Sequence, residues 1–168
     1  MAVLNRGRDF IYLATPRTAS RATVAALMKL DGSIEVAPHH VGLPAVLDEH
    51  PEGCEIVFTT VRNPYDWLVS QYLTCGGCYG TWDGWLEYQM QERDSIFQRF
   101  AGQHTEVAKY ETLSTDLKKI VGDDVVLERD PLHSTEGKPK NYLDMWDEDT
   151  RTKVRQHFAA DFEEYGYD

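Results

Sequence analysis

Two short apolar runs, each followed at once by a turn and a helical segment, constrain the fold of this sequence most. Residues 9–14 (DFIYLA) are rich in aromatic and branched side chains, and residues 22–30 carry apolar side chains at helical spacing. Residues 55–61 (EIVFTTV) form the second run, and Asn63 and Pro64 after it suit the cap and the start of a helix. The sequence therefore predicts two buried strands, each leading through a turn into a helix.

The rest of the chain continues this alternation. Helical patterns cover residues 65–73, 82–91, 113–121 and 147–161, and strand patterns cover residues 106–110 and 125–127. Strands that alternate with helices predict an α/β fold with a parallel sheet. In such sheets ligands bind beyond the carboxyl ends of the strands, so the turns after the strands are the first candidates for a site.

Length and charge narrow the class of protein. The 168 residues suit a single domain, residues 1–168, with a core of its own. The net charge of −11 argues against non-specific binding to nucleic acid and against polyanionic substrates. No apolar run approaches the ~20 residues that span a bilayer, and residues 1–9 contain no apolar signal core. We therefore expect a cytoplasmic protein without a membrane span.

The cysteines favour a plain loop over a metal or redox site. Their number is three, and an odd count disfavours a disulfide framework. Cys75 and Cys78 form a CxxC pair, but structural zinc needs about four ligands, and only Cys54 and scattered histidines could complete the set. A redox pair normally opens a helix, whereas this pair follows one. We therefore expect no metal, with metal or redox chemistry as the alternative.

The turn after the first strand, residues 15–21 (TPRTASR), has the chemistry of an anion site. Helix N-termini present backbone N–H groups without partners, which bind phosphate or sulfate oxygens. Side chains add hydroxyl and guanidinium donors: Thr18, Ser20, Thr23, Arg17 and Arg21. The turn is not a Walker A loop, because GxxxxGK[ST] is absent and residues 15–30 lack glycine. A capped helix with solvated arginines is the alternative interpretation.

A second candidate anion site follows the second strand. Arg62 stands at the carboxyl end of that strand, and Ser70 lies two turns into the next helix. An arginine and a serine that converge on one point make a phosphate clamp. The alternative interpretation is an arginine in a salt bridge and a serine that packs within the helix.

Together these segments resemble the signatures of the sulfotransferases that use 3′-phosphoadenosine-5′-phosphosulfate (PAPS). PRTAS at residues 16–20 resembles the family's 5′-phosphosulfate motif, and VRNPYDWLVSQY at residues 61–72 resembles its 3′-phosphate motif. KYETL at residues 109–113 looks like the family's Tyr-Glu-x-Leu segment, and DFEEYGY at residues 161–167 is similar to its C-terminal closure. The matches follow the family's order and extend over nearly the whole chain.

The resemblance implies a fold, a donor and a set of binding residues. The fold would be a three-layer α/β sandwich with a central, mostly parallel sheet, like that of P-loop nucleotide hydrolases. PAPS would be the donor, adenosine 3′,5′-bisphosphate the product, and no metal would be needed. The 5′ end would be held by the turn, namely by Arg17, Thr18, Ala19, Ser20 and Arg21. Arg62 and Ser70 would hold the 3′-phosphate, and Tyr110 would contact the base.

The sequence departs from the family's usual pattern at three points. Arg17 stands where many members have lysine, and Ala19 replaces the common glycine, which suggests a slightly wider turn. The chain is also short for the family, so we expect the insertions that bind the acceptor to be trimmed. Lys138 lies in a polar loop, residues 133–140, where related enzymes close a basic loop over the nucleotide; a solvated loop is the alternative.

Sulfuryl transfer needs a cation at the leaving phosphate and a general base for the hydroxyl acceptor. Arg17 is the candidate cation, because its charge is permanent. His40 is the preferred base and His39 the second choice, since similar enzymes often place a histidine in this stretch, before a short helix. A structural histidine pair, or Glu35 or Glu49 as the base, are the alternatives.

The acceptor is an open class: a sugar, a lipid headgroup, a small alcohol or phenol, or a peptide tyrosine. The acidic composition favours a neutral or cationic one. Tyr79, Trp82 and Trp85 are candidates for an acceptor pocket, although aromatic side chains in a helix more often belong to the core. A P-loop nucleotide kinase and a catalytically silent nucleotide-binding protein are the alternative functions. The oligomeric state has no sequence signal.

Overall fold

The chain divides into two compact units in a computed structural model. The structure describes residues 1–37, 40–75, 80–97, 100, 102–128 and 142–168. Unit 1 comprises Met1–Val61 and Arg99–Ser134, and unit 2 comprises Arg62–Gln98 and Thr135–Asp168. The prediction of one domain over residues 1–168 stays a prediction.

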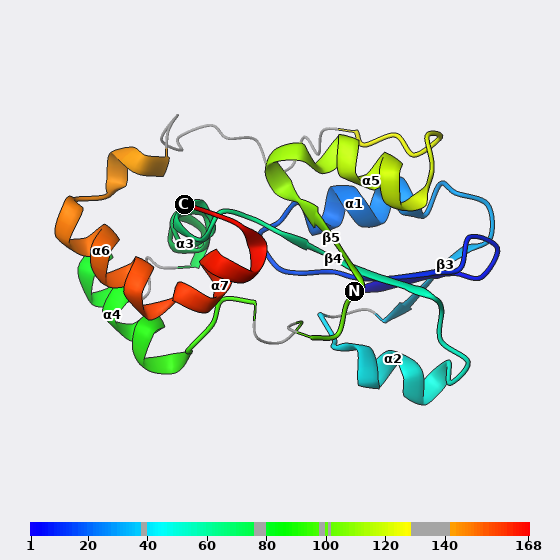
Figure 1. The fold of residues 1–168 in the computed structure, drawn as a ribbon, viewed down its shortest axis with the longest axis horizontal. Helices are drawn as coiled ribbons and strands as arrows, with labels where there is room; N and C mark the ends of the chain where they lie inside the picture. Colours follow the sequence, from blue (N-terminus) through cyan, green and yellow to red (C-terminus); the bar gives the residue numbers. More distant parts are fainter. Residues whose placement is uncertain (38–39, 76–79, 98–99, 101, 129–141) are drawn as a thin grey trace. The chain divides into compact units, whose positions relative to one another are not determined.

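Unit 1 is built on a five-stranded sheet. Its strands are β1 (Ala2–Asn5), β2 (Phe10–Leu13), β3 (Ser33–Ala37), β4 (Ile56–Val61) and β5 (Glu106–Lys109), in the order β3-β1-β2-β4-β5. The pairs β2–β4 and β4–β5 are parallel, whereas β1 runs antiparallel to both β2 and β3 (Figure 1). The predicted α/β class is therefore confirmed, with a mixed sheet in which β1 alone runs opposite to the others.

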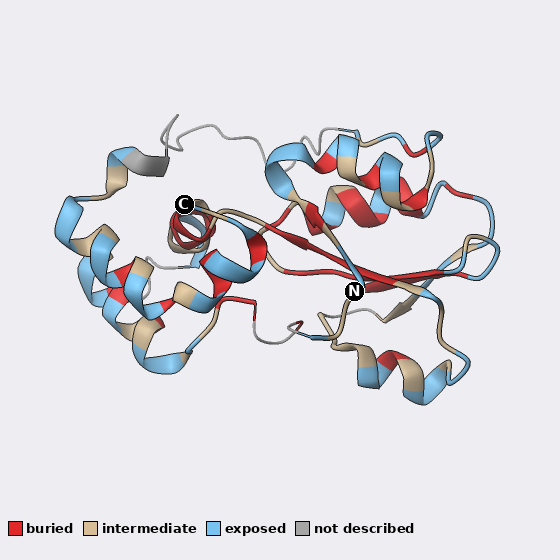
Figure 2. Ribbon diagram, in the orientation of Figure 1, coloured by how far each residue is buried: buried red, intermediate tan, exposed pale blue. Residues whose placement is uncertain are grey.

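Helices cover both faces of this sheet. The helices α1 (Ser20–Leu27) and α5 (Leu113–Val121) lie on one face and α2 (Leu43–Glu49) on the other (Figure 1). Along β2, Phe10 and Tyr12 join the apolar cluster under α1 and α5, while Ile11 and Leu13 join the cluster under α2. All four are fully buried, and Figure 2 shows this strand in red. A strand covered on both faces has no polar side, which explains the unbroken apolar run in the sequence.

The predicted elements agree with unit 1 except in three places. The strands β2, β4 and β5 and the helices α1 and α5 were expected within a few residues of their observed bounds. The strands β1 and β3 were missed; β3 is a half-exposed edge strand, so its sequence lacks the unbroken apolar run of β2. Residues 125–127 form no strand: Val125 packs into the α1–α5 cluster while Val126 is 61% exposed, an alternation without a partner strand.

Unit 2 is helical in its described part. It contains α3 (Pro64–Cys75), α4 (Trp82–Glu92), the 3₁₀ turn η4 (Tyr142–Met145), α6 (Glu148–His157) and α7 (Ala159–Tyr165). The single helix predicted over residues 147–161 is two helices, and this prediction was wrong. The break falls at Phe158, which is fully buried, and α7 buries Phe162 and Tyr165 after the break. Among the described helices, none has the length and apolar character needed to cross a membrane.

Candidate functional site

Three of the predicted binding segments follow the carboxyl ends of neighbouring parallel strands. The register pairs Leu13 of β2 with Thr59 of β4, and Val61 of β4 with Lys109 of β5. The turn at residues 15–21 comes after β2, Arg62 comes directly after β4, and Tyr110 comes directly after β5. The carboxyl edge of a parallel sheet is where α/β proteins bind their ligands, as the sequence led us to expect.

The backbone of the turn adopts a conformation that is unusual for its residues. Arg17 has a φ of 64° and Ala19 a φ of 60°, so both lie in the left-handed region. Each costs about 1–2 kcal/mol for a residue other than glycine. Such residues cluster at functional sites, and left-handed residues that alternate with right-handed ones turn successive N–H groups towards one point, where anions bind. Ala19 thus has a conformation that ordinarily favours glycine.

The first turn of α1 has no side-chain cap. Ala19 is the N-cap residue, and α1 has neither a side-chain hydrogen bond at its cap nor an acidic residue in its first turn. The first cap bond is within the backbone, from the N–H of Thr23 to the carbonyl of Ala19 (3.0 Å). The alternative interpretation of this segment was a capped helix with solvated arginines, and its side-chain cap is absent at Ala19. A bare helix start favours an anion.

Two of the predicted hydroxyl donors face the protein interior. The side chains of Thr18 and Thr23 are fully buried. Thr18 Oγ1 donates to the carbonyl of Thr15 (2.8 Å), and Thr23 Oγ1 donates to the carbonyl of Ala19 (3.1 Å). Each hydroxyl has one proton, so neither has one left for a ligand. This corrects the sequence interpretation: Thr18 can offer a ligand its backbone N–H, and its side chain braces the turn.

Hydroxyls of the sheet that sequence reasoning missed lie beneath the turn. Thr15 Oγ1 bonds to Thr59 Oγ1 (2.7 Å), Thr18 Oγ1 to Thr60 Oγ1 (2.5 Å), and Thr60 Oγ1 to the phenol of Tyr12 (3.0 Å). Burial raises the pKa of the Tyr12 phenol well above its usual value, so this group stays protonated. The signal was present in the sequence, since two adjacent threonines interrupt the apolar run at residues 55–61.

The structure brings the predicted base to the start of the turn. His40 Nδ1 lies 2.5 Å from the carbonyl oxygen of Ala14, the residue before Thr15. A carbonyl oxygen can only accept, so Nδ1 carries the proton, and the lone pair of the neutral ring is on Nε2. His40 also precedes α2, as the resemblance implied. Glu35 on β3 and Glu49 at the end of α2 are exposed. His39 lies outside the described residues.

Arg62 and Ser70 have structural contacts within unit 2. Arg62 Nε forms an ion pair with Asp66 Oδ2 (2.5 Å), and both side chains are less than a fifth exposed, at 14% and 18%. Asn63 Oδ1 accepts from the N–H of Tyr65 (3.0 Å), which confirms the predicted cap. Ser70 is buried within α3. Both observations match the alternative interpretation, and the assignment of the two residues to a 3′-phosphate stays a prediction.

Tyr110 stands on a short, braced turn. It begins the 3₁₀ turn η2 (Tyr110–Thr112), and its side chain is 36% exposed. Asp116 of α5 accepts from the N–H of Lys109 (3.1 Å) and from Thr112 Oγ1 (2.6 Å), which closes the turn on both sides. Burial opposes the charge of Asp116, but these hydrogen bonds prevail and lower its pKa. Lys138 and the rest of the loop at residues 133–140 lie outside the described residues.

Trp82 and Trp85, two of the three aromatic residues considered for an acceptor pocket, belong to a packed cluster in unit 2. Trp82 stacks on Trp85 with ring centres 5.5 Å apart, and edge-on contacts join it to Tyr72 and Trp146. Trp85 is 1% exposed, which favours the core interpretation. Tyr79 and Cys78 lie outside the described residues. Within the described ranges, no three His, Cys, Asp or Glu side chains gather in a way that could hold a metal ion.

A search of protein-family models, curated proteins and solved structures found no match to this chain. The resemblance to sulfotransferases therefore depends on the signature residues themselves.

Proposed function

We propose that this protein transfers a sulfuryl group from PAPS to a hydroxyl acceptor. We call residues 15–21 the donor turn. The observation that carries the proposal is the position of His40, whose imidazole is hydrogen-bonded to Ala14, the residue directly before this turn. A candidate base and a candidate anion-binding turn thus come from residues 26 positions apart in the chain. A solvated surface histidine would not require this contact.

The turn would bind the phosphosulfate end of the donor. The backbone N–H groups at residues 18–20 would contact its oxygens, and the guanidinium groups of Arg17 and Arg21 would add charge. Negative charge grows on the leaving phosphate as the sulfur–oxygen bond breaks, and a fixed cation there stabilises the transition state. Arg17 has this role in the proposal: its guanidinium charge is permanent, so it acts as an electrostatic stabiliser and not as a proton donor.

His40 would act on the acceptor. As the acceptor oxygen bonds to sulfur, its proton passes to His40 Nε2, and the bond from sulfur to the bridging oxygen breaks. Adenosine 3′,5′-bisphosphate leaves with the electron pair of that bond. The contact between Nδ1 and Ala14 supports this role, because it fixes the tautomer whose Nε2 accepts a proton. Arg62 and Ser70 at the 3′-phosphate, Tyr110 at the base and Lys138 over the nucleotide remain part of the proposal through the resemblance.

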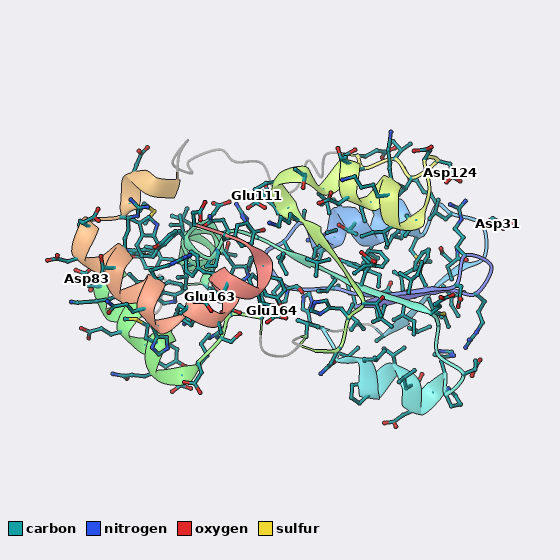
Figure 3. All side chains as sticks on the ribbon, viewed as in Figure 1. Asp31, Asp83, Glu111, Asp124, Glu163 and Glu164 are labelled. Atoms are coloured by element: carbon teal, nitrogen blue, oxygen red, sulfur yellow. The ribbon has the colours of Figure 1, made fainter. Side chains whose placement is uncertain are left out.

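The surface charge suggests a class of acceptor. Figure 3 labels six exposed carboxylates distributed over both units: Asp31, Asp83, Glu111, Asp124, Glu163 and Glu164. With a net charge of −11, the protein repels anions at long range. Neutral or cationic acceptors are therefore proposed over acidic polysaccharides. A panel of sugars, phenols, alcohols and tyrosine peptides, read by mass spectrometry for added sulfate, would identify the class.

Nucleotide titration tests the donor. Adenosine 3′,5′-bisphosphate should bind tightly without magnesium, and Arg17→Ala should weaken this binding while Arg17→Lys keeps most of it. Calorimetry would measure all three proteins. A preference for magnesium-ATP over the bisphosphate would reject the proposal in favour of a kinase. Tight bisphosphate binding without sulfate transfer to any acceptor in the panel would leave a silent nucleotide-binding protein.

A further inference from the structure

Two adjacent threonines at the end of β4 hold the donor turn from opposite faces of the sheet. Thr59 and Thr60 are both fully buried. Neighbouring residues of a strand point to opposite faces, so the two hydroxyls reach the turn by separate routes. Thr59 bonds to Thr15 (2.7 Å) and Thr60 bonds to Thr18 (2.5 Å), and both contacts join residues more than 40 positions apart.

The direction of each hydrogen bond follows from the number of protons. Thr18 Oγ1 donates its only proton to the carbonyl of Thr15, so Thr60 must donate to Thr18. The proton of Thr60 is then in use, so the phenol of Tyr12 must donate to Thr60. The result is one directed chain, from Tyr12 through Thr60 and Thr18 to the backbone of Thr15.

A second, shorter chain fixes the other side of the turn. Thr59 Oγ1 donates to the carbonyl of Leu13 (2.7 Å), so Thr15 must donate to Thr59. The two chains meet at Thr15, where one ends on the carbonyl and the other begins at the hydroxyl. Thr15 is therefore held at two points, through its side-chain hydroxyl and through its main-chain carbonyl oxygen.

The chain through Thr60 passes between the two unusual residues of the turn, at Thr18, before it ends at Thr15. Thr18 lies between Arg17 and Ala19, which both have left-handed φ angles. Such conformations persist only where the surrounding structure over-determines them. Thr18 is fully buried, whereas Arg17 and Ala19 are half-buried, and Thr60 is the described residue whose side chain bonds to Thr18 from the neighbouring strand.

We infer that Thr60 is a positioning residue for the donor turn, holding Thr18 so that Arg17 and Ala19 keep the left-handed conformations that direct their N–H groups at an anion. This role rests on the proposed function for its purpose, because the anion is the 5′ end of PAPS in that proposal. Thr60 itself is buried and does not touch the donor.

The test compares three variants in the full chain. Thr60→Val keeps the shape and removes the hydroxyl, and Thr60→Ser keeps the hydroxyl. Thr105→Val is the matched control: Thr105 Oγ1 accepts from Val57 N (3.1 Å) and donates to its carbonyl (3.2 Å), near the amino end of β4 and away from the turn. In ligand-free protein, the HN–Hα couplings of Arg17 and Ala19 report the φ angles of the turn, and their amide exchange rates report how often it opens. Calorimetry with adenosine 3′,5′-bisphosphate reports the affinity of the turn for its proposed ligand.

Thr60→Val should alter the couplings and speed exchange at the turn, and should weaken bisphosphate binding about tenfold, as expected for one buried hydrogen bond. Thr60→Ser and Thr105→Val should do neither: serine keeps the hydroxyl, and Thr105 is an exposed residue whose described hydrogen bonds go to Val57 and not to the turn. A turn that is unchanged in Thr60→Val, or altered equally in the serine variant or the control, would overturn the inference. If the wild-type protein binds no bisphosphate, the proposed function fails, and the ligand-free couplings still decide the role of Thr60.

Discussion

At the scale of single residues, the hydrogen bond of His40 makes its proposed role testable without moving the side chain. Asparagine can place a donor N–H near the position of Nδ1 and keep the bond to Ala14, but it has no basic nitrogen in place of Nε2. A positioned general base contributes roughly 10²- to 10⁴-fold to a rate.

His40→Asn should therefore lower kcat for sulfate transfer by about two orders of magnitude or more, while bisphosphate affinity and melting temperature stay near those of the wild type. Steady-state kinetics and calorimetry on the same preparation would check this. His50→Asn is a suitable control, because His50 caps the far end of α2. Equal loss of activity in both variants would argue against His40 as the base.

The left-handed Ala19 gives a stability prediction. Glycine adopts a φ of 60° without steric cost, although it also gains entropy in the unfolded chain. The relief of about 1–2 kcal/mol of steric cost equals or exceeds the entropic loss of about 0.4–1 kcal/mol, so Ala19→Gly should leave the free energy of unfolding unchanged or raise it by up to about 1.5 kcal/mol.

The matched change is Ala25→Gly, at an exposed position inside α1. Here glycine relieves no steric strain and brings only its entropic cost. Ala25→Gly should destabilise by about 1 kcal/mol. Urea denaturation of the two variants would measure the difference. An Ala19→Gly variant as unstable as Ala25→Gly would contradict the left-handed conformation of the turn.

At the scale of elements, a buried carboxylate joins α7 to the chain segment before residue 98. Asp161 is 2% exposed, and it accepts hydrogen bonds from Ser95 Oγ (2.6 Å) and from the N–H groups of Ile96 (2.7 Å) and Phe97 (3.3 Å). Burial raises the pKa of Asp161, and the hydrogen bonds from Ser95 and the two N–H groups oppose that shift.

The raised pKa sets the sign of a pH effect. Between the ordinary pKa of an aspartate and its raised folded value, the folded protein binds more protons than the unfolded chain. The stabilisation from Asp161 is thus complete below the ordinary value and declines as pH rises through the folded one. Asp161→Asn should lack this pH-dependent contribution to stability. Its side-chain amide also sets an N–H group against the backbone N–H donors, so the variant should lose about 1–3 kcal/mol of the free energy of unfolding. Urea titrations of both proteins across this pH window would show a difference that varies with pH, and a constant difference would be the contrary result.

At the scale of the whole molecule, each unit has its own apolar core. Unit 1 buries side chains on both faces of its sheet, and unit 2 buries Tyr65, Trp67, Trp85 and Phe162 among its helices. The chain's four tryptophans, Trp67, Trp82, Trp85 and Trp146, all belong to unit 2. Tryptophan fluorescence therefore reports unit 2, whereas the sheet signal in far-UV circular dichroism comes from unit 1.

Because each unit has an apolar core of its own, we expect the two probes to give different midpoints in urea, and the bisphosphate to raise the circular dichroism midpoint. Coincident transitions at every ligand concentration would instead support the single cooperative domain that the length of the sequence suggests. A Trp67→Phe variant, which removes one reporter from a buried site, would confirm the source of the fluorescence signal.

The sequence by itself determined the elements that surround the candidate site. The apolar runs of β2 and β4, the cap at Asn63 and the pattern of α5 are local signals, readable because periodicity and capping act between near neighbours. These signals placed the turn at residues 15–21 and Arg62 after strand ends, and they placed Tyr110 at the last position of a strand that in fact ends at Lys109. They did not separate α6 from α7, because the break depends on the burial of Phe158 rather than on a glycine or proline.

Tertiary structure alone decided how those residues are used. It turned the hydroxyl of Thr18 inward to Thr60, 42 positions away, and brought His40 to Ala14, 26 positions away. It also set β1 antiparallel within the sheet, where the fully buried Asn5 side chain donates to Asp31 and to Ser33 of β3. Each contact joins groups that approach only when the strands pair, so local pattern carries no signal for it. A short polar residue can face a ligand or the core, and only the packed sheet fixes which.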